Sequence, residues 1–328
     1  MMELLEVIPP ELIRLALALA VLAAFVGANA LLLVYIERKT AGFVQRRPGP
    51  YEVGPRGILT PVADAFKLMG KQSLIPDCAD RPLFRLAPLL AFAPLLLMMM
   101  PMEFGPNLYG LSLNMGLLLI LAFAGVNVLA VCLAGWSSNN KWSLLGAARA
   151  VAQSVAYEIP VLLCVLAVLF MTGSLDMLEI GAGQGPWPWQ WNVVMQPLAF
   201  ILFFICSLAE SHRAPFDLPE AESELTAGFH TEYSGMPFAI FFLAEYTEMT
   251  ILCAVAVILF LGGWQGPFMP GPWWFLIKLY ALLLIMIWIR WTFPRVRFDI
   301  MLSLCWRYFI PLALLNLFIT AVVLALVR

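Results

Sequence analysis

The segment PFAIFFLAEYTEMTILCAVAVILFL, residues 237–261, decides the fold. Its only charged side chains are those of Glu245 and Glu248. An α-helix needs about 20 mainly apolar residues to cross the hydrocarbon core of a bilayer. We therefore expect a membrane-spanning helix here, and the two acids within it need an explanation of their own.

Further runs of the same kind fill most of the chain. Of its 328 residues, 62% are hydrophobic and 12% are charged, whereas a soluble domain carries about 25% charged residues. The sequence therefore predicts an all-α integral membrane protein, with a single membrane domain over residues 1–328 and eight transmembrane helices. The predicted spans are 11–36, 82–103, 111–135, 147–171, 192–210, 237–261, 272–293 and 306–327.

The distribution of basic residues predicts how these helices are oriented. Connections without lysine or arginine alternate with connections that hold nearly all of them. The first set is 104–110, 172–191 and 262–271, and the second set is 37–81, 136–149, 210–236 and 290–307. Because loops rich in Lys and Arg stay in the cytoplasm, the second set is expected there. With eight spans, both termini then lie on the outer, periplasmic side. Acids, not bases, precede the first apolar run, so we expect no cleavable signal peptide.

The first cytoplasmic loop, residues 37–81, contains a short amphipathic segment. A cluster of prolines and glycines from Pro48 to Gly57 breaks any helix before it. Apolar residues then recur at helical spacing, at Ile58, Leu59, Val62, Ala63, Phe66 and Met69. This pattern predicts a helix at about 57–71 that lies on the membrane surface. It is either a simple anchor or one wall of a cavity against the first span.

Several carboxyl groups fall where a membrane protein rarely tolerates them. Glu158, Glu245 and Glu248 lie inside predicted spans, and Glu210 ends the fifth span. An isolated charge at this depth costs on the order of 3 kcal/mol. A single buried acid is explained equally well as a neutral, hydrogen-bonded structural group. Like charges at close range do not all ionise in a low dielectric, so the set as a whole favours a proton path. Glu103, at the outer end of the second span, is expected to be merely interfacial.

The loop 210–236 forms the predicted mouth of this path. Glu220, Glu222 and Glu224 follow Pro219, which is suited to the first turn of a helix. Upstream, Arg213 and Asp217 flank a Pro-Phe pair, and the two histidines of the chain, His212 and His230, are able to titrate near neutral pH. A solvated acidic cap is the competing explanation for these charges.

Other kinds of chemistry have no support in the sequence. The six cysteines form no C-x-x-C pair, so neither an Fe–S cluster nor a zinc site is expected. The two histidines lack a third ligand at a suitable spacing for a metal ion. The net charge of −2 gives no reason to expect a nucleic-acid partner. Any electrons would come from a cofactor on a partner, which the basic and aromatic segments VQRRPGPY and WIRWTFPRVRF would dock; lipid head groups explain these arginines equally well.

Four long blocks closely resemble the quinone-site membrane subunit of respiratory complex I. The blocks are ERKTAGFVQRRPGPYEVGPRGILTPVADAFKL, GWSSNNKWSLLGAARAVAQSVAYEIP, AESHRAPFDLPEAESELTAGFHTEYSGMPFAIFFLAEY and WIRWTFPRVRFDIMLSLCWRYFIP. The resemblance runs from Glu37 to Pro311. Membrane subunits of energy-converting hydrogenases are similar, but they keep the acidic-loop block less completely.

The resemblance implies two sets of functional residues. The first set borders the membrane end of a quinone chamber and comprises Glu37, Arg38, Arg46, Asp64, Arg213, Phe216 and Asp217. The second set couples this chamber to proton movement and comprises Glu158, Glu210, Glu220, Glu222, Glu224, Glu232, Glu245 and Glu248. Two positions depart from the family. His212 stands where Asn is common, and Asn127 stands in the third span where some members carry a carboxylate.

The expected function is therefore that of a multi-pass subunit of a proton-translocating NADH:quinone oxidoreductase in the cell inner membrane. Quinone is the expected substrate, and the flavin and Fe–S clusters are expected on partner subunits. The expected partners are Fe–S-bearing peripheral subunits at the cytoplasmic face, and small and antiporter-like subunits within the membrane. The alternative is a membrane anchor of an energy-converting hydrogenase or of a related complex with another electron donor. A free-standing secondary transporter would show a sequence repeat, and none is visible.

Overall fold

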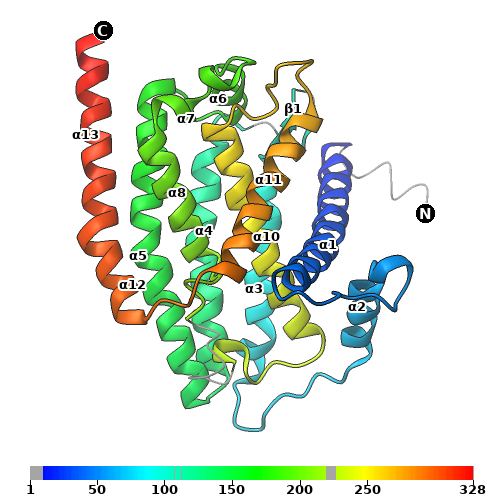
Figure 1. Cartoon of the computed structure of the whole chain (residues 1–328). Coiled ribbons are helices and arrows are strands. Elements are labelled where there is room, and N and C mark those ends of the chain that lie inside the picture. Colours follow the sequence, from blue (N-terminus) through cyan, green and yellow to red (C-terminus); the bar gives the residue numbers. More distant parts are fainter. Residues whose placement is uncertain (1–9, 107, 112, 219–226, 328) are drawn as a thin grey trace.

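Helices that run roughly parallel dominate the computed structural model, which describes residues 10–106, 108–111, 113–218 and 227–327 (Figure 1). The helices are α1 (Pro10–Val44), α2 (Thr60–Gly70), α3 (Arg81–Met99), α4 (Gly116–Ser137), α5 (Lys141–Thr172), α6 (Met177–Ala182), α7 (Asn192–Met195), α8 (Pro197–Glu210), α10 (Met236–Phe260), α11 (Pro272–Thr292), α12 (Phe298–Leu304) and α13 (Ile310–Val327). Short 3₁₀ turns are η1 (Pro55–Gly57), η2 (Pro188–Gln190) and η3 (Gly228–His230), and η4 (Cys305–Phe309) is a π-helical turn.

Seven helical segments of the described chain are long and apolar enough to cross a membrane. They correspond to all the predicted spans except 192–210, with ends that differ by several residues. The last of them, Phe298–Leu326, runs through α12, η4 and α13 without a break. The predicted surface helix at 57–71 corresponds to α2. In Figure 1, the start of α1 and the end of α13 lie at the same end of the bundle, opposite α2.

The predicted span 192–210 differs most from expectation. It is divided into the short α7 and the 14-residue α8, which at 1.5 Å per residue covers about 21 Å of a hydrocarbon core of about 30 Å. The break falls at Gln196, because Pro197 has no N–H to donate to the preceding turn. The side chain of Gln196 instead accepts a hydrogen bond from Asn316 and donates one to Thr320, so this break is tied to α13.

The structure also contains strands that the all-α prediction did not include. β1 (Glu103–Gly105) and β2 (Leu108–Tyr109) form an antiparallel hairpin after α3. Glu103 is not the interfacial residue expected from the sequence, because it is only 2% exposed. Its position in the hairpin turns it inward instead of toward the membrane surface.

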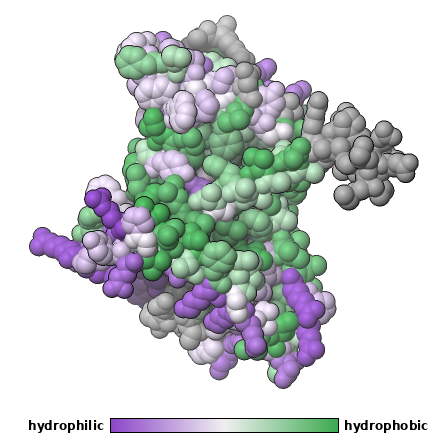
Figure 2. Space-filling model, turned by 90° about the vertical axis from the view of Figure 1, so that its right-hand side faces the viewer, coloured by the Kyte–Doolittle hydropathy of each residue, from purple (hydrophilic) through white to green (hydrophobic). Residues whose placement is uncertain are grey.

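α10 lies at the centre of the bundle and α13 lies at its edge (Figure 1). In the most apolar 18-residue stretch of α10, 78% of the residues are buried, compared with 11% for Phe298–Leu326. Helices that are apolar on all sides are typical of such central positions. Figure 2 shows the consequence for the surface: hydrophobic side chains form a band across the middle, and hydrophilic ones gather mostly at the lower end, near α2.

An intramembrane lysine ends α10. The Nζ atom of Lys278, on α11, donates hydrogen bonds to the carbonyl groups of Leu261, Gly263 and Gln265. It also lies 4.0 Å from the centre of the Trp191 ring. Because the last carbonyls of a helix lack intrahelical partners, this one cation satisfies groups that would otherwise be unpaired, which explains why a lysine is tolerated here.

Candidate functional site

α8 ends at Glu210, and the segment that follows is buried instead of solvated. Ser211, His212 and Arg213 are 1%, 8% and 5% exposed. His212 adopts a left-handed backbone conformation, with φ of 50°, which His and Asn accept more readily than most residues. A proline at 215 then prevents the helix from continuing. The chain therefore carries non-helical backbone deep inside the bundle, which a membrane protein tolerates only where protein or a cavity surrounds it.

Gln153 of α5 holds this segment in place. Its amide group donates hydrogen bonds to the carbonyl of Ala209 at 2.6 Å and to the carbonyl of Phe216 at 2.9 Å. The Phe216 ring packs against Tyr157, with 5.7 Å between the ring centres. Both ends of the segment are thereby fixed to α5. Sequence reasoning missed Gln153; its only signal was an uncharged polar residue inside an apolar run.

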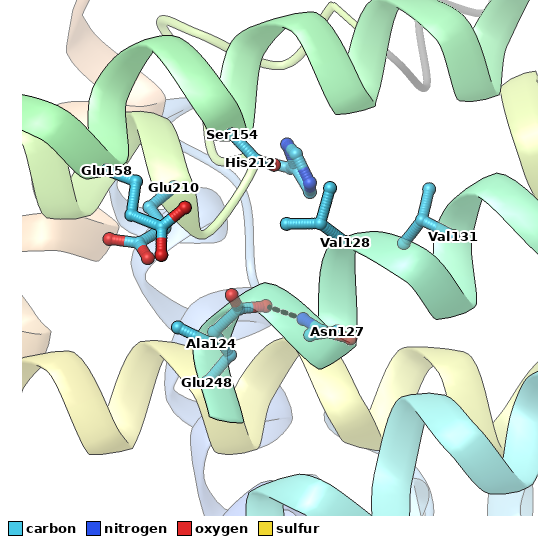
Figure 3. Close-up of a pocket in the computed structure, with 9 residues that line it drawn as sticks. All are labelled: Ala124, Asn127, Val128, Val131, Ser154, Glu158, Glu210, His212 and Glu248. Carbon is cyan, nitrogen blue, oxygen red and sulfur yellow. Dashed lines mark hydrogen bonds between the residues drawn. The ribbon is translucent and has the colours of Figure 1, made fainter. Parts of the chain in front are cut away.

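Three acids meet in a small internal cavity at the end of α8. This cavity, which we call the carboxylate cavity, has a volume of about 10 Å³, close to the minimum for one water molecule. It is lined by Ala124, Asn127, Val128, Val131, Ser154, Glu158, Glu210, His212 and Glu248 (Figure 3). The structure thus brings together three of the predicted acids from α5, α8 and α10.

The polar groups of the carboxylate cavity are only partly satisfied. Asn127 donates a hydrogen bond to Glu248 at 2.8 Å. The Oε2 atom of Glu210 is buried and has no hydrogen-bond partner among the described residues. A buried oxygen without a partner is costly unless it binds a proton or a water molecule. This arrangement is suited to receiving and releasing protons.

Glu245 lies in a separate cluster of charges. The Nη2 atom of Arg213 lies 3.7 Å from Glu245, and its Nη1 atom lies 3.9 Å from Glu37 of α1. Glu37 also accepts hydrogen bonds from the Tyr246 hydroxyl at 2.5 Å and from Arg290 of α11. We call these residues, Glu37, Arg213, Glu245, Tyr246 and Arg290, the ion-pair cluster. Its two arginines balance its two acids, which is how a protein tolerates buried charge.

The ion-pair cluster opens to the surface through Glu37. A cavity of about 300 Å³ is lined by Glu37, Arg38, Ala41, Arg47, Gly49, Pro50 and Trp291. We call it the surface cavity. It is formed by the end of α1, the loop that follows and the end of α11. Arg47, which the sequence did not single out, lines it; Arg46, which was expected at the chamber, is exposed and is not among these residues.

The remaining predicted chamber residues lie outside the surface cavity. Asp64 of α2 accepts a hydrogen bond from Arg38 at 2.5 Å, so it touches a residue that lines the cavity. Asp217 pairs with Arg295 at 3.0 Å. Phe216 packs in the core, as described above. α2 therefore contributes to this region through Asp64, not through its apolar face, where Phe66 and Met69 are exposed.

The other predicted acids divide into two groups. Glu232 accepts a hydrogen bond from Asn140 at 2.6 Å, where the described part of the acidic loop meets the start of α5. Glu220, Glu222 and Glu224, and the helix expected after Pro219, lie outside the described residues. Ser143 and the carbonyl of Phe229 form a further bond of 2.8 Å that fastens this loop to α5.

The chain is similar over nearly its whole length to proteins of one family. The family model described as "NADH dehydrogenase" matches residues 16–321. The NADH-quinone oxidoreductase subunit of type H from Desulfotalea psychrophila is 50% identical, over 94% of this chain and 96% of the relative. The corresponding protein of Dehalococcoides mccartyi is 47% identical over 94% and 86%, and that of Carboxydothermus hydrogenoformans is 44% identical over 97% and 91%. The resemblance read from the four sequence blocks is confirmed, and the chain belongs to the NADH dehydrogenase family that includes these NADH-quinone oxidoreductase subunits.

Proposed function

We propose that this chain is the membrane subunit of a proton-translocating NADH:quinone oxidoreductase, that it forms the membrane end of the quinone chamber, and that it couples quinone reduction to proton movement. One observation carries the proposal. Glu37 lines the surface cavity and also belongs to the ion-pair cluster. The cluster includes Glu245, one helical turn before Glu248 of the carboxylate cavity. An open cavity and a group of buried acids are therefore joined by one short series of charged side chains.

The surface cavity supports the chamber role. At about 300 Å³ it lies at the lower end of the range for small-molecule sites, which are mostly apolar with a few orienting polar groups. Trp291 and Ala41 supply apolar surface, while Glu37 and Arg38 supply polar groups. This space fits part of a quinone, and a peripheral subunit would cover the rest. Arg46, Asp64, Arg213, Phe216 and Asp217 border the chamber in this proposal.

The coupling step follows from the charge change of the reaction. A quinone takes up two electrons, supplied by an Fe–S cluster on the partner subunit, and two protons to become a quinol. A change of charge beside Glu37 alters the balance within the ion-pair cluster. Arg213 then shifts its interaction between Glu37 and Glu245, and a charge shift at Glu245 changes the proton occupancy of Glu158, Glu210 and Glu248. Glu220, Glu222, Glu224 and Glu232 would supply protons from the acidic loop.

The arrangement of the chain supports a defined position in the complex. In this proposal α8 and the buried segment after it provide the eighth passage through the bilayer. The end that carries α2 faces the cytoplasm and docks the peripheral arm with its flavin and Fe–S clusters. Both termini face the periplasm of a cell with an inner membrane, and antiporter-like subunits continue the proton path within the membrane.

Glu210→Gln tests the proposal in the purified complex reconstituted into vesicles. The amide keeps the shape of the side chain but binds no proton. We expect proton pumping to fall about tenfold or more, since general acid–base groups typically contribute at least that much. NADH oxidation by a water-soluble acceptor should stay unchanged, because it needs only the peripheral arm. Glu179→Gln, at an exposed position on α6, is the matched control. Normal quinone reduction and normal pumping in Glu210→Gln would overturn the proposal.

A further inference from the structure

The imidazole of His212 lies at the junction between the two buried clusters. It lines the carboxylate cavity together with Glu158, Glu210 and Glu248 (Figure 3). The next residue in the chain, Arg213, belongs to the ion-pair cluster. A proton or a charge change that passes from one cluster to the other therefore passes His212.

The backbone fixes the place of this side chain. The N–H of His212 donates to the carbonyl of Ala209 at 3.2 Å, and Arg213 donates to the carbonyl of Leu208 at 3.2 Å. Gln153 holds the carbonyl of Ala209 from the other side. His212 is only 8% exposed. The imidazole is thus placed in the cavity by the turn that ends α8, and not by chance on a mobile loop.

The chemistry of the cavity favours an imidazole that titrates. Within the described residues, the titratable groups that line the cavity with it are Glu158 on α5, Glu210 on α8 and Glu248 on α10. A carboxyl group carries its proton on one of two equivalent oxygens. An imidazole accepts a proton on one nitrogen and releases another from the opposite nitrogen, and its ordinary pKa is near neutral. The cavity has room for about one water molecule to bridge it to an acid.

We propose that His212 is a proton-transfer residue of the carboxylate cavity, exchanging protons with its three acids and giving the coupling reaction a pH dependence that an amide at this position would remove. This inference rests on the proposed function and deepens it. An imidazole is not needed to form the turn, because Asn adopts the same left-handed conformation. The role of the ring is therefore separable from the role of the backbone.

The test compares His212→Asn with the unaltered complex in vesicles, from pH 5.5 to 8.5. The measured quantities are the rate of quinone reduction and the protons pumped per NADH. We expect the unaltered complex to show an ionisation in the imidazole range that is missing in His212→Asn. The pumping rate at the optimum should fall about tenfold, at the low end for a proton-transfer group because water is able to replace the ring in part. Superimposable pH profiles would overturn the inference and leave His212 as a turn residue.

Two further variants keep the outcome interpretable. If His212→Asn fails to assemble, His212→Gly, which also suits the turn, is measured with and without added imidazole. Recovery of pumping by imidazole supports the inference, and no recovery contradicts it. Glu210→Gln is measured alongside: if it loses pumping while His212→Asn retains the normal profile, only the inference about His212 fails. If both pump normally, the proposed function itself fails.

Discussion

Arg213 is the residue on which the candidate site depends most. Its guanidinium lies within 4 Å of both Glu37 and Glu245, and 4.3 Å from the centre of the Tyr246 ring. Glu37 and Tyr246 belong to helices that are 209 residues apart in the sequence where they meet. Buried ion pairs of this kind add little net stability but are costly to break on one side only. A side chain with such surroundings is better explained by control of charge than by packing.

Glu103 offers a test of burial at the residue scale. It lies in β1, outside the membrane-spanning helices; burial, with repulsion from Asp176 as a smaller cause, raises its pKa from 4.5 to about 7. One oxygen of Glu103 has no partner among the described residues. Below pH 4.5 this group is neutral in both the folded and the unfolded chain. As the pH rises toward 7 it ionises first in the unfolded chain, so the folded state loses stability over this interval.

We expect Glu103→Gln to remove this pH dependence. Above pH 7 the variant should be more stable than the unaltered chain by about 1–3 kcal/mol, and at pH 4.5 the two should be similar. Thermal unfolding in detergent between pH 4.5 and 8.5, followed by the exposure of buried cysteines to a thiol reagent, measures the difference. Glu179→Gln, on an exposed position, should leave the curve unchanged. A constant offset between Glu103→Gln and the unaltered chain at every pH would contradict the expectation.

At the scale of the element, the early end of α8 creates the site. Had the helix continued, its next turn would have filled the space now occupied by His212 and Arg213. The left-handed turn at His212 instead directs two consecutive side chains into different clusters. The uncapped backbone groups of this turn are satisfied by Gln153 and by bonds within the turn. The helix is shorter than the apolar run because the polar groups within reach favour a turn.

α13 gives a second example of an element held by polar groups. Most of its surface is exposed in the isolated chain, but Asn316 and Thr320 face Gln196 and form a buried three-residue network. Hydrogen bonds between membrane helices are worth about 0.6–1.7 kcal/mol each. The network therefore fixes the position of α13 along α8, where apolar contacts alone would allow it to slide.

Asn316→Leu should loosen α13. The variant leaves the Gln196 carbonyl without its donor, and we expect a loss of about 1–2 kcal/mol. Hydrogen exchange of the α13 amides in micelles should become about 5- to 30-fold faster, while exchange in α10 stays the same. Leu315→Ala, one residue away but 53% exposed, is the matched control. Equal exchange rates in Asn316→Leu and in the unaltered chain would show that the network does not hold the helix.

At the scale of the whole molecule, the bundle surrounds α10. α1, α3, α8 and α11 all contact it, so its two acids face different neighbours, although they lie one turn apart. Glu245 meets Arg213, and Glu248 meets Asn127. The central helix thereby places the ion-pair cluster and the carboxylate cavity next to each other. It connects charge at one end of the molecule with acids in its interior.

The orientation in the membrane is open to a direct test. The start of α5 lies at the end of the bundle that carries the basic loops, and α6 lies at the opposite end (Figure 1). In a chain in which Cys78 is replaced by Ser, a membrane-impermeant maleimide should label Glu179→Cys in whole spheroplasts and Lys141→Cys only in inverted vesicles. Both positions are exposed, and the positive-inside rule sets the expectation. Labelling of both from one side, or the reverse sidedness, would refute the proposed topology.

Much of the architecture could be read from the sequence because it depends on local properties. The length of an apolar run determines whether a helix is able to cross the bilayer, and seven segments of the described chain do meet this requirement. Motif blocks such as AESHRAPFDLPEAESEL identified the family, and the unusual acids within apolar runs singled out Glu158, Glu210 and Glu248. These three do line one cavity in the structure.

The sequence by itself thus determined the membrane class, the family and the acids to consider. Only the tertiary structure decided that α8 stops at mid-bundle, that Gln153 holds the turn, that Glu103 is buried and that Glu245 parts from Glu248. The physical reason is that these outcomes depend on partners distant in the chain, such as Asn127 and Glu248, which are 121 residues apart. Hydropathy describes how each residue meets lipid or water, whereas a buried charge is governed by the particular groups that surround it.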